Sequence, residues 1–204
     1  MDQQTREQFF INALVTEHFV LQAARGAMIG EMVGRGSIYL GTVSSALIAF
    51  GFIAQTELRL APFVAAVLPA LFVLGELTFV ALLRDSFQNI EFLRRIQKIR
   101  GYYRGLLPEA EEFFDPPGRD RETASEMATV GLGRGAALLF TGASVIAAVN
   151  SILGGAGLAL LLAHTIRLDE AVVATVGVLA AVLLFGLHLA YEHWRGGDAV
   201  RPQP

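Results

Sequence analysis

Four long apolar stretches constrain the fold of this 204-residue chain more than any other feature. They cover roughly residues 37–54, 60–83, 135–163 and 171–191. A helix needs about 20 mostly apolar residues to cross the hydrocarbon core of a bilayer, within a range of about 17–25. Three stretches fit, whereas the third is long for one upright span and contains Gly154-Gly155-Ala156-Gly157, where it can tilt, kink or end. Because the bilayer offers no water to backbone groups and period-2 alternation is absent, we expect helices rather than a barrel.

The composition agrees with lipid as the main solvent. The chain is 53% hydrophobic and 17% charged, whereas soluble domains carry about 25% charged residues. Between residues 36 and 83 the only ionisable residues are Tyr39, Glu57, Arg59 and Glu76. The N-terminal residues show no cleavable signal peptide. The chain contains no cysteine, which excludes disulfides, thiol catalysis and cysteine-based metal sites.

Basic residues predict the orientation of the spans. Of the 16 Lys and Arg residues, 14 lie before the first span, between the second and third, or after the fourth. Only Arg59 and Arg167 lie in the two other connections. By the positive-inside rule we expect a multi-pass protein of the inner (plasma) membrane with its N- and C-termini in the cytoplasm.

These spans predict an all-α, polytopic transmembrane bundle with helical extensions into the cytoplasm. We expect five segments: a cytoplasmic amphipathic helix at 1–34, a first transmembrane hairpin at 35–83, a basic and then acidic cytoplasmic segment at 84–127, a second hairpin at 128–194 and a disordered cytoplasmic tail at 195–204.

A Gly-Arg-Gly triplet precedes both the first and the third apolar stretch. Aligning residues 34–50 with 133–149 gives seven identities in 17 positions. Two interpretations stay open, a duplication of a two-span hairpin and convergent chemistry at the point of membrane entry. In either, Arg35 and Arg134 lie where a helix enters the bilayer, and their long side chains can extend to the lipid phosphates.

Three glycines predict close helix packing near the first span. Gly26, Gly30 and Gly34 follow one another at intervals of four residues, so they lie on one side of a helix. This small-xxx-small pattern lets two backbones approach closely. We therefore expect a specific helix–helix contact here, with a second copy of the chain as the expected partner.

A basic cluster follows the second span and comprises Arg94, Arg95, Lys98 and Arg100. Together with Arg35 it forms the predicted set of lipid-headgroup contacts. The cluster either binds anionic lipid or only enforces the topology, and topology is the simpler interpretation. Acidic residues close behind it argue against nucleic-acid binding.

Glu76 is the most informative single residue, because it lies about 10 Å inside the second span at a rise of about 1.5 Å per residue. A carboxylate at that depth is costly and is by default a candidate functional group. Arg134 and His188 are expected at comparable depth, so either residue is a candidate partner for Glu76. Asn150 is expected deeper, toward the outer half of the third span. Glu76 either holds helices together as a neutral acid or paired ion, or takes part in proton or ion transport.

No motif predicts catalysis, a metal or a cofactor. The segment "HLAYEH", residues 188–193, lacks the HExxH or HxxEH spacing of zinc sites. The segment "GLGRGA", residues 131–136, lacks the spacing, the lysine and the preceding strand of a phosphate-binding loop. We therefore expect a non-enzymatic protein.

The segments "YLGTVSSALIAFGF", "LPALFVLGELTFV" and "IRGYYRGLLPEA" resemble an uncharacterised, largely actinobacterial family of multi-span membrane proteins. This resemblance implies a helical membrane protein and no particular activity. A looser similarity is to two-span membrane effector modules of bacterial defence systems, although the third and fourth spans depart from that pattern.

The sequence leaves three functions open. The leading prediction is an inner-membrane protein that self-associates as a scaffold or pore-like assembly. The alternatives are a small ion- or proton-coupled transporter or channel that uses Glu76 and His188, and an effector that disrupts the membrane. The predicted partners are the lipid bilayer, with anionic lipid among its components, and a second copy of the chain.

Overall fold

The computed structural model describes residues 2–55, 60–114, 141–166 and 169–199, and within these ranges it contains helices and no strand. The long helices are α1 (Gln3–Ala54), α2 (Leu60–Arg104), α5 (Gly142–Thr165) and α6 (Glu170–Ala199), and a short 3-10 helix, η1 (Pro108–Glu112), follows α2. Each long helix is apolar and long enough to cross a membrane. This confirms the predicted all-α fold with four candidate spans, as expected of a multi-pass membrane protein.

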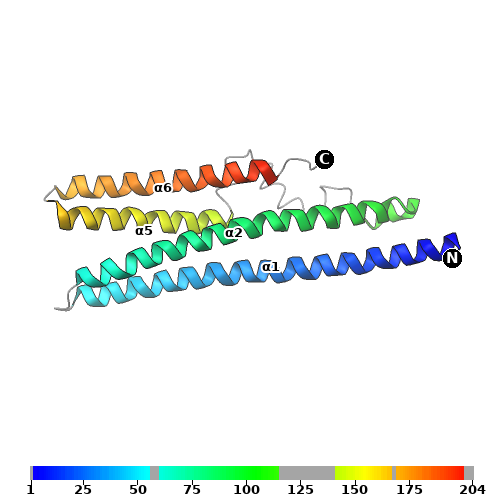
Figure 1. Ribbon diagram of the computed structural model, residues 1–204, viewed down its shortest axis with the longest axis horizontal. Coiled ribbons are helices and arrows are strands. Elements are labelled where there is room, and N and C mark those ends of the chain that lie inside the picture. Colours follow the sequence, from blue (N-terminus) through cyan, green and yellow to red (C-terminus); the bar gives the residue numbers. More distant parts are fainter. Residues whose placement is uncertain (1, 56–59, 115–140, 167–168, 200–204) are drawn as a thin grey trace.

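The first two helices are much longer than α5 and α6 (Figure 1). α1 has 52 residues and α2 has 45, so at about 1.5 Å per residue each is more than twice as long as a hydrocarbon core of about 30 Å is thick. α5 has only 24 residues, which suits a single crossing. We call the end where α1 stops and α2 starts the hairpin end, and the opposite end the basic end. The α1–α2 pair projects beyond α5 and α6 at the basic end.

Three helices continue past positions where the sequence allowed a change of structure. α1 continues without a break across residues 34 and 35, where the cytoplasmic helix was expected to give way to the first span. α5 runs through Gly154–Gly157 and ends at Thr165, so the helix does not stop at the glycines. α6 extends to Ala199, past residue 194, where a disordered tail was expected to follow. The Gly-Arg-Gly triplet around Arg134 lies outside the described residues.

Local side-chain chemistry explains how polar residues fit these helices. Asp2 caps α1 by accepting a hydrogen bond from the Thr5 backbone N–H at 2.7 Å, which satisfies a donor left free at the helix start. Inside the spans, the hydroxyls of Thr42 and Thr78 donate to the carbonyl four residues earlier, at 2.7 and 2.8 Å. Such bonds satisfy a hydroxyl within its own helix, so it needs no water.

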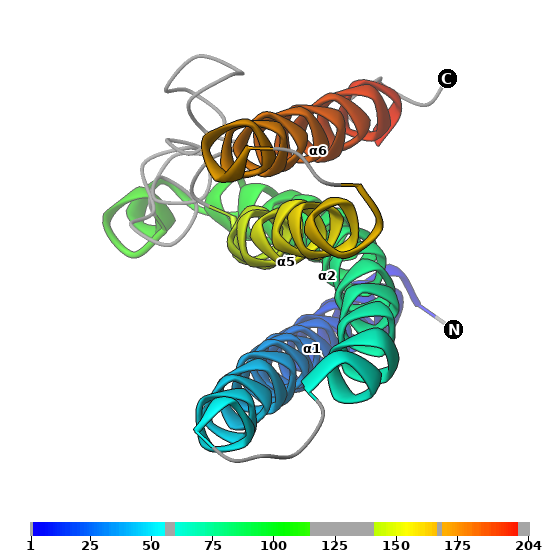
Figure 2. The ribbon, with the colours of Figure 1, turned by 90° about the vertical axis from the view of Figure 1, so that its left-hand side faces the viewer.

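The four helices form a curved row in chain order, α1–α2–α5–α6 (Figure 2). α2 and α5 occupy the middle of the row, whereas α1 and α6 flank it and contact the helices beyond their immediate neighbours only slightly. Both outer helices expose many large apolar side chains, including Ile38, Ile48 and Leu183. A bilayer would solvate these faces, because an apolar surface of this extent is unusual on a soluble monomer.

Two clusters of buried side chains hold the row together. The larger cluster joins α1, α2 and α5, and its largest fully buried side chains are those of Tyr39, Phe79 and Ile146. The smaller cluster joins the projecting parts of α1 and α2 through Leu21, Ile96 and Ile99. The larger cluster surrounds the polar residues described next.

Candidate functional site

The centre of the candidate site is a carboxylate–imidazole pair between α2 and α6. The Oε1 atom of Glu76 lies 3.0 Å from Nε2 of His188. The same Oε1 accepts a hydrogen bond of 2.9 Å from Nδ2 of Asn150 on α5. Of the predicted intramembrane candidates, the structure thus brings together Glu76, His188 and Asn150. Arg134, the other predicted partner of Glu76, lies outside the described residues.

The hydrogen bonds around Asn150 bring the remaining helix into the site. The Tyr39 hydroxyl on α1 donates to Oδ1 of Asn150 at 3.0 Å, and Nδ2 of Asn150 also donates to the Phe72 carbonyl at 3.1 Å. Tyr39 is 1% exposed and Asn150 is fully buried. All four membrane helices therefore meet at one connected set of polar side chains.

A glycine beside Glu76 makes room for this network. A Cβ atom on Gly75 would lie 2.1 Å from Oδ1 of Asn150 and 2.7 Å from the Tyr39 hydroxyl oxygen. No side chain at position 75 fits this arrangement, because real Cβ atoms do not approach other atoms so closely. The Gly-Glu dipeptide in the second span thus provides both the acid and the space for its partners.

The hydrogen bonds of His188 indicate which of its ring nitrogens carries hydrogen. Nδ1 of His188 lies 2.7 Å from the Leu184 carbonyl oxygen and 3.4 Å from the Ser151 hydroxyl. A carbonyl oxygen only accepts, so Nδ1 carries hydrogen and donates to it. The contact between Nε2 and Glu76 then needs a second proton, either on Nε2, giving an ion pair, or on the carboxyl group, giving a neutral pair. The pair therefore holds one proton that either residue can carry.

The two members of the pair differ in exposure. The side chain of His188 is 7% exposed and that of Glu76 is 37% exposed. The Phe79 ring covers the imidazole edge-on, with 4.7 Å between the ring centroids. The imidazole is thus enclosed, whereas the Glu76 side chain is partly exposed at the surface of the bundle.

A second polar group joins α1 and α2 toward the basic end. Arg35 donates to Asp85 at 3.1 Å and also contacts Glu31 on its own helix. The Asp85 side chain is only 5% exposed, and Arg84 lies 3.3 Å from it. One turn further along α2, Asn89 accepts a bond of 2.9 Å from Arg25. Arg35 was predicted to contact lipid headgroups, and the structure places it in an ion pair with a third of its side chain exposed.

A third polar group lies where α5 begins. The Thr141 hydroxyl, which caps α5, donates to Oε1 of Glu192 at 3.0 Å. Glu192 is 3% exposed, and its other carboxylate oxygen is buried without a hydrogen-bond partner in the part of the chain that the structure describes. Glu192 follows His188 by one turn of α6.

The remaining predicted residues lie apart from this network. Added Cβ atoms on Gly26, Gly30 and Gly34 would meet nothing within 4 Å, so this glycine stripe contacts no other described part of the chain. In the basic cluster, Arg95 pairs with Glu91 at 3.0 Å. Lys98 is exposed, and Arg94 and Arg100 take part in further interactions. No group of three His, Asp or Glu residues suited to a metal ion occurs within the described ranges.

Sequence reasoning missed Tyr39, Gly75, Ser151 and Asp85 as members of these polar groups. A usable signal existed for Gly75, because a small residue beside an acid inside a membrane helix leaves space for a partner. For Tyr39, Ser151 and Asp85 the sequence carries no such signal, since their roles depend on how each helix is rotated about its axis.

Comparison with known proteins gives no match to a family model, to a curated protein or to a solved structure. The resemblance to a multi-span bacterial family therefore stays a prediction, and the interpretation of the site depends on its geometry.

Proposed function

We propose that the protein is a small proton-coupled transporter or channel in which the Glu76–His188 pair binds and releases the proton. The observation that carries this proposal is the 3.0 Å contact between Oε1 of Glu76 and Nε2 of His188, combined with the Leu184 carbonyl that keeps hydrogen on Nδ1. A proton shared by an acid and an imidazole transfers at little cost when the two groups are already in contact. Ionisable groups inside membrane helices are typical of such proton relays.

The exposure of Glu76 supports exchange of that proton. The Glu76 side chain is 37% exposed, so it is not sealed inside the bundle, and we propose that its carboxyl group exchanges the proton on this side. Asn150 bonds to the same oxygen as His188, so it can hold the carboxyl group in place in both protonation states. The competing interpretation is that the pair only connects α2 to α6.

The test is proton flux through vesicles that contain the purified full-length chain and a pH-sensitive dye. We expect wild-type protein to pass protons above protein-free vesicles under an imposed pH gradient, and Glu76→Gln to lose most of that flux. Gln keeps the size and an acceptor oxygen of Glu, so the variant should fold, which thermal unfolding in detergent verifies. Glu192→Gln is the matched control, because Glu192 is a buried acid on the neighbouring turn that does not contact Glu76, and it should retain flux.

Two results would remove the transport proposal. Wild-type protein that passes no protons would remove it directly. Unchanged flux in Glu76→Gln would show that the protons take another path. Either result would leave the pair as a structural connection between two helices.

A second function, self-association, is favoured by the glycine stripe of Gly26, Gly30 and Gly34. The stripe is exposed, and the residues Phe19 and Val33 beside it are 69% and 64% exposed. Glycines in a helix cost about 1 kcal/mol each relative to alanine, and no contact within the described chain compensates for this cost. We propose that a second copy of the chain packs on this side of α1.

Crosslinking in native membranes tests the association. We expect wild-type protein to give dimers or larger species and Gly30→Leu to reduce them several-fold. Gly101→Leu is the control, because Gly101 is also exposed on a helix near the basic end and has nothing within 4 Å. Exclusively monomeric wild-type protein would contradict the proposal, as would equal crosslinking of the two variants.

A further inference from the structure

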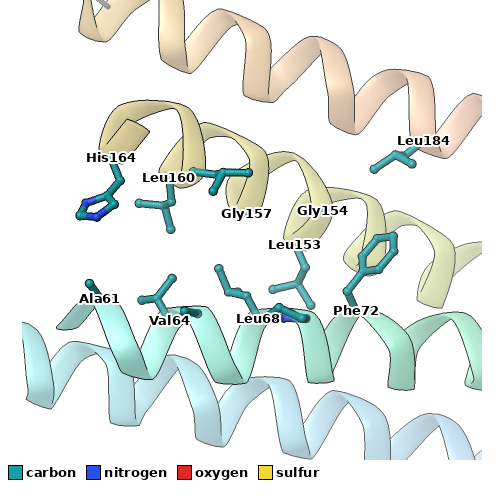
Figure 3. Close-up of a pocket in the computed structure, with 13 residues that line it drawn as sticks. Ala61, Val64, Leu68, Phe72, Leu153, Gly154, Gly157, Leu160, His164 and Leu184 are labelled. Carbon is teal, nitrogen blue, oxygen red and sulfur yellow. The ribbon is translucent and has the colours of Figure 1, made fainter. Parts of the chain in front are cut away.

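An apolar cleft lies between α2 and α5 near the hairpin end (Figure 3). Its volume is about 690 Å³, which is within the range of about 300–1,000 Å³ typical of ligand pockets. Its walls are almost entirely apolar and include Ala61, Val64, Leu68, Gly157, Leu160 and Leu161. The cleft is separate from the Glu76–His188 pair, which is not among its lining residues.

Two glycines of α5 shape the cleft: Gly157 leaves it open, and Gly154 lies where it becomes narrow. Gly157 presents no side chain, and a Cβ atom there would lie 3.9 Å from Leu68 across the cleft. At Gly154 the helices are closer, since a Cβ atom would lie 2.8 Å from the Phe72 ring and 2.7 Å from Leu184. The cleft therefore narrows at Phe72 and Leu184, and His164 lies at its other end, toward the helix termini (Figure 3).

Physical chemistry restricts what can fill this space. If a cavity of this size were empty, the atoms of its walls would lose the dispersion contacts that they make with an occupant. Water is poorly held, because an apolar cavity supplies few of the two to four polar partners that a buried water needs. The helices that form both walls are spans suited to a bilayer, so hydrocarbon is the surrounding solvent and is the apolar material available to enter.

We propose that this cleft binds one acyl chain of a membrane phospholipid. The chain lies along α2 and α5 with its end near Phe72 and Leu184. The ester and headgroup remain at the hairpin end, beside the exposed imidazole of His164. The inference is independent of proton transport, because it depends on the shape and apolar lining of the cleft and not on Glu76.

The test is photolabelling of the full-length protein in phospholipid vesicles that contain a phospholipid with a diazirine in the middle of one acyl chain. We expect labelling within residues 61–72 and 153–164 to exceed, several-fold, labelling at Leu179 and Leu183, which are 62% and 64% exposed on α6 and do not line the cleft. A second arm uses a free fatty acid with the same diazirine. Labelling of the cleft by the fatty acid alone would contradict the assignment to phospholipid.

Variants that fill the cleft from either wall test whether the labelling comes from an acyl chain inside the cleft. Gly157→Leu on α5 and Ala65→Leu on α2 each place a side chain in the space, and we expect each to lower cleft labelling several-fold. The matched controls are Gly186→Leu, at an exposed glycine of α6 with nothing within 4 Å, and Ala66→Leu, at the exposed residue next to Ala65 that does not line the cleft. Both controls should label like wild type.

Three outcomes would overturn the proposal. Cleft peptides labelled no more than the outward face of α6 would show ordinary solvation by the bilayer. Labelling unchanged by both filling variants would place the lipid elsewhere. A crosslink from the cleft to a second protein chain, in place of lipid, would show that a protein segment occupies it.

Discussion

The two hairpins of this protein use glycine in opposite ways. Between α5 and α6, Gly155 and Gly177 face each other, and a Cβ atom on Gly155 would lie 2.4 Å from the Gly177 carbonyl oxygen. Along α1, the glycine stripe of Gly26, Gly30 and Gly34 has nothing within 4 Å. Glycine therefore marks a tight helix contact in one hairpin and an exposed surface in the other.

The facing helix accounts for this difference. α6 presents small residues to Gly155, since its nearest neighbours there are Gly177 and Ala181, so the two backbones can approach. No described helix faces the glycine stripe, because α1 joins α2 through its own Arg35 and Arg25, which bond to Asp85 and Asn89 of α2. A small-residue pattern thus indicates where close packing is allowed, whereas the partner helix decides whether it occurs.

The largest expected effect comes from filling the contact between α5 and α6. Gly155→Ala would force the α6 backbone away, because the added methyl group meets a carbonyl oxygen and the Ala181 backbone rather than a flexible side chain. We expect a loss of about 3 kcal/mol, toward the upper end of typical overpacking costs. The measurement is the free energy of unfolding in detergent micelles.

Gly157→Ala is the matched control on the same helix. Its added methyl group would lie 3.9 Å from Leu68, an ordinary contact, so the variant should be as stable as wild type or slightly more stable. Equal destabilisation of the two variants would mean that the short distance at Gly155 does not reflect a tight interface.

A smaller effect is expected in the other hairpin, from removal of Arg35. Arg35→Ala leaves the Asp85 carboxylate, which is 5% exposed, with only the more exposed Arg84 beside it. We expect destabilisation of about 2 kcal/mol, because a buried charge loses a hydrogen-bonded partner. The unfolding free energy of the full chain is again the measurement.

Arg95→Ala provides the comparison for that variant. Arg95 and Glu91 are 59% and 52% exposed, and exposed pairs four residues apart on a helix contribute about 0.3–0.5 kcal/mol. If Arg35→Ala lowers the free energy of unfolding no more than Arg95→Ala does, then the Arg35–Asp85 ion pair stabilises the α1–α2 pair no more than an exposed ion pair would.

The sequence predicted the spans well because hydrophobicity alone decides them. The same physical reasoning left Arg134 and His188 as candidate partners of Glu76, since an acid inside a membrane helix needs a partner and few candidates exist at that depth. The structure shows the contact with His188, and Arg134 lies outside the described residues. Sequence reasoning placed Asn150 deeper than Glu76, whereas the structure shows the two side chains hydrogen-bonded at 2.9 Å.

Helix rotation and helix spacing explain what the sequence could not predict. The spans are apolar all round, so their composition does not fix which side faces inward, and Tyr39 was therefore missed. Asp85 lies at the end of its span beside Arg84, which suggests exposure. Its burial follows from α1 continuing unbroken alongside α2. The cleft depends on the spacing between α2 and α5, which no residue pattern records.

The smallest predicted effect concerns pH and the projecting part of the α1–α2 hairpin, which has no counterpart in α5–α6. Burial, and secondarily the positive charge of Arg100, lowers the pKa of His18 below its ordinary value of 6.5. His18 packs edge-on against Tyr103, with 6.5 Å between ring centroids. The unfolded segment therefore binds a proton more readily than the folded one. The projecting part of the α1–α2 pair should be most stable above pH 6.5, and its stability should decline as the pH falls through that value.

Hydrogen exchange of the amides around Leu21 and Ile99 measures this local opening, which should be faster at pH 5 than at pH 8 after correction for intrinsic rates. His18→Leu should abolish the difference, because leucine keeps the apolar contact and carries no titratable group. A variant that retained the full pH dependence would assign it to another group in the hairpin and would show that the neutral imidazole contributes nothing to the pairing of these two helices.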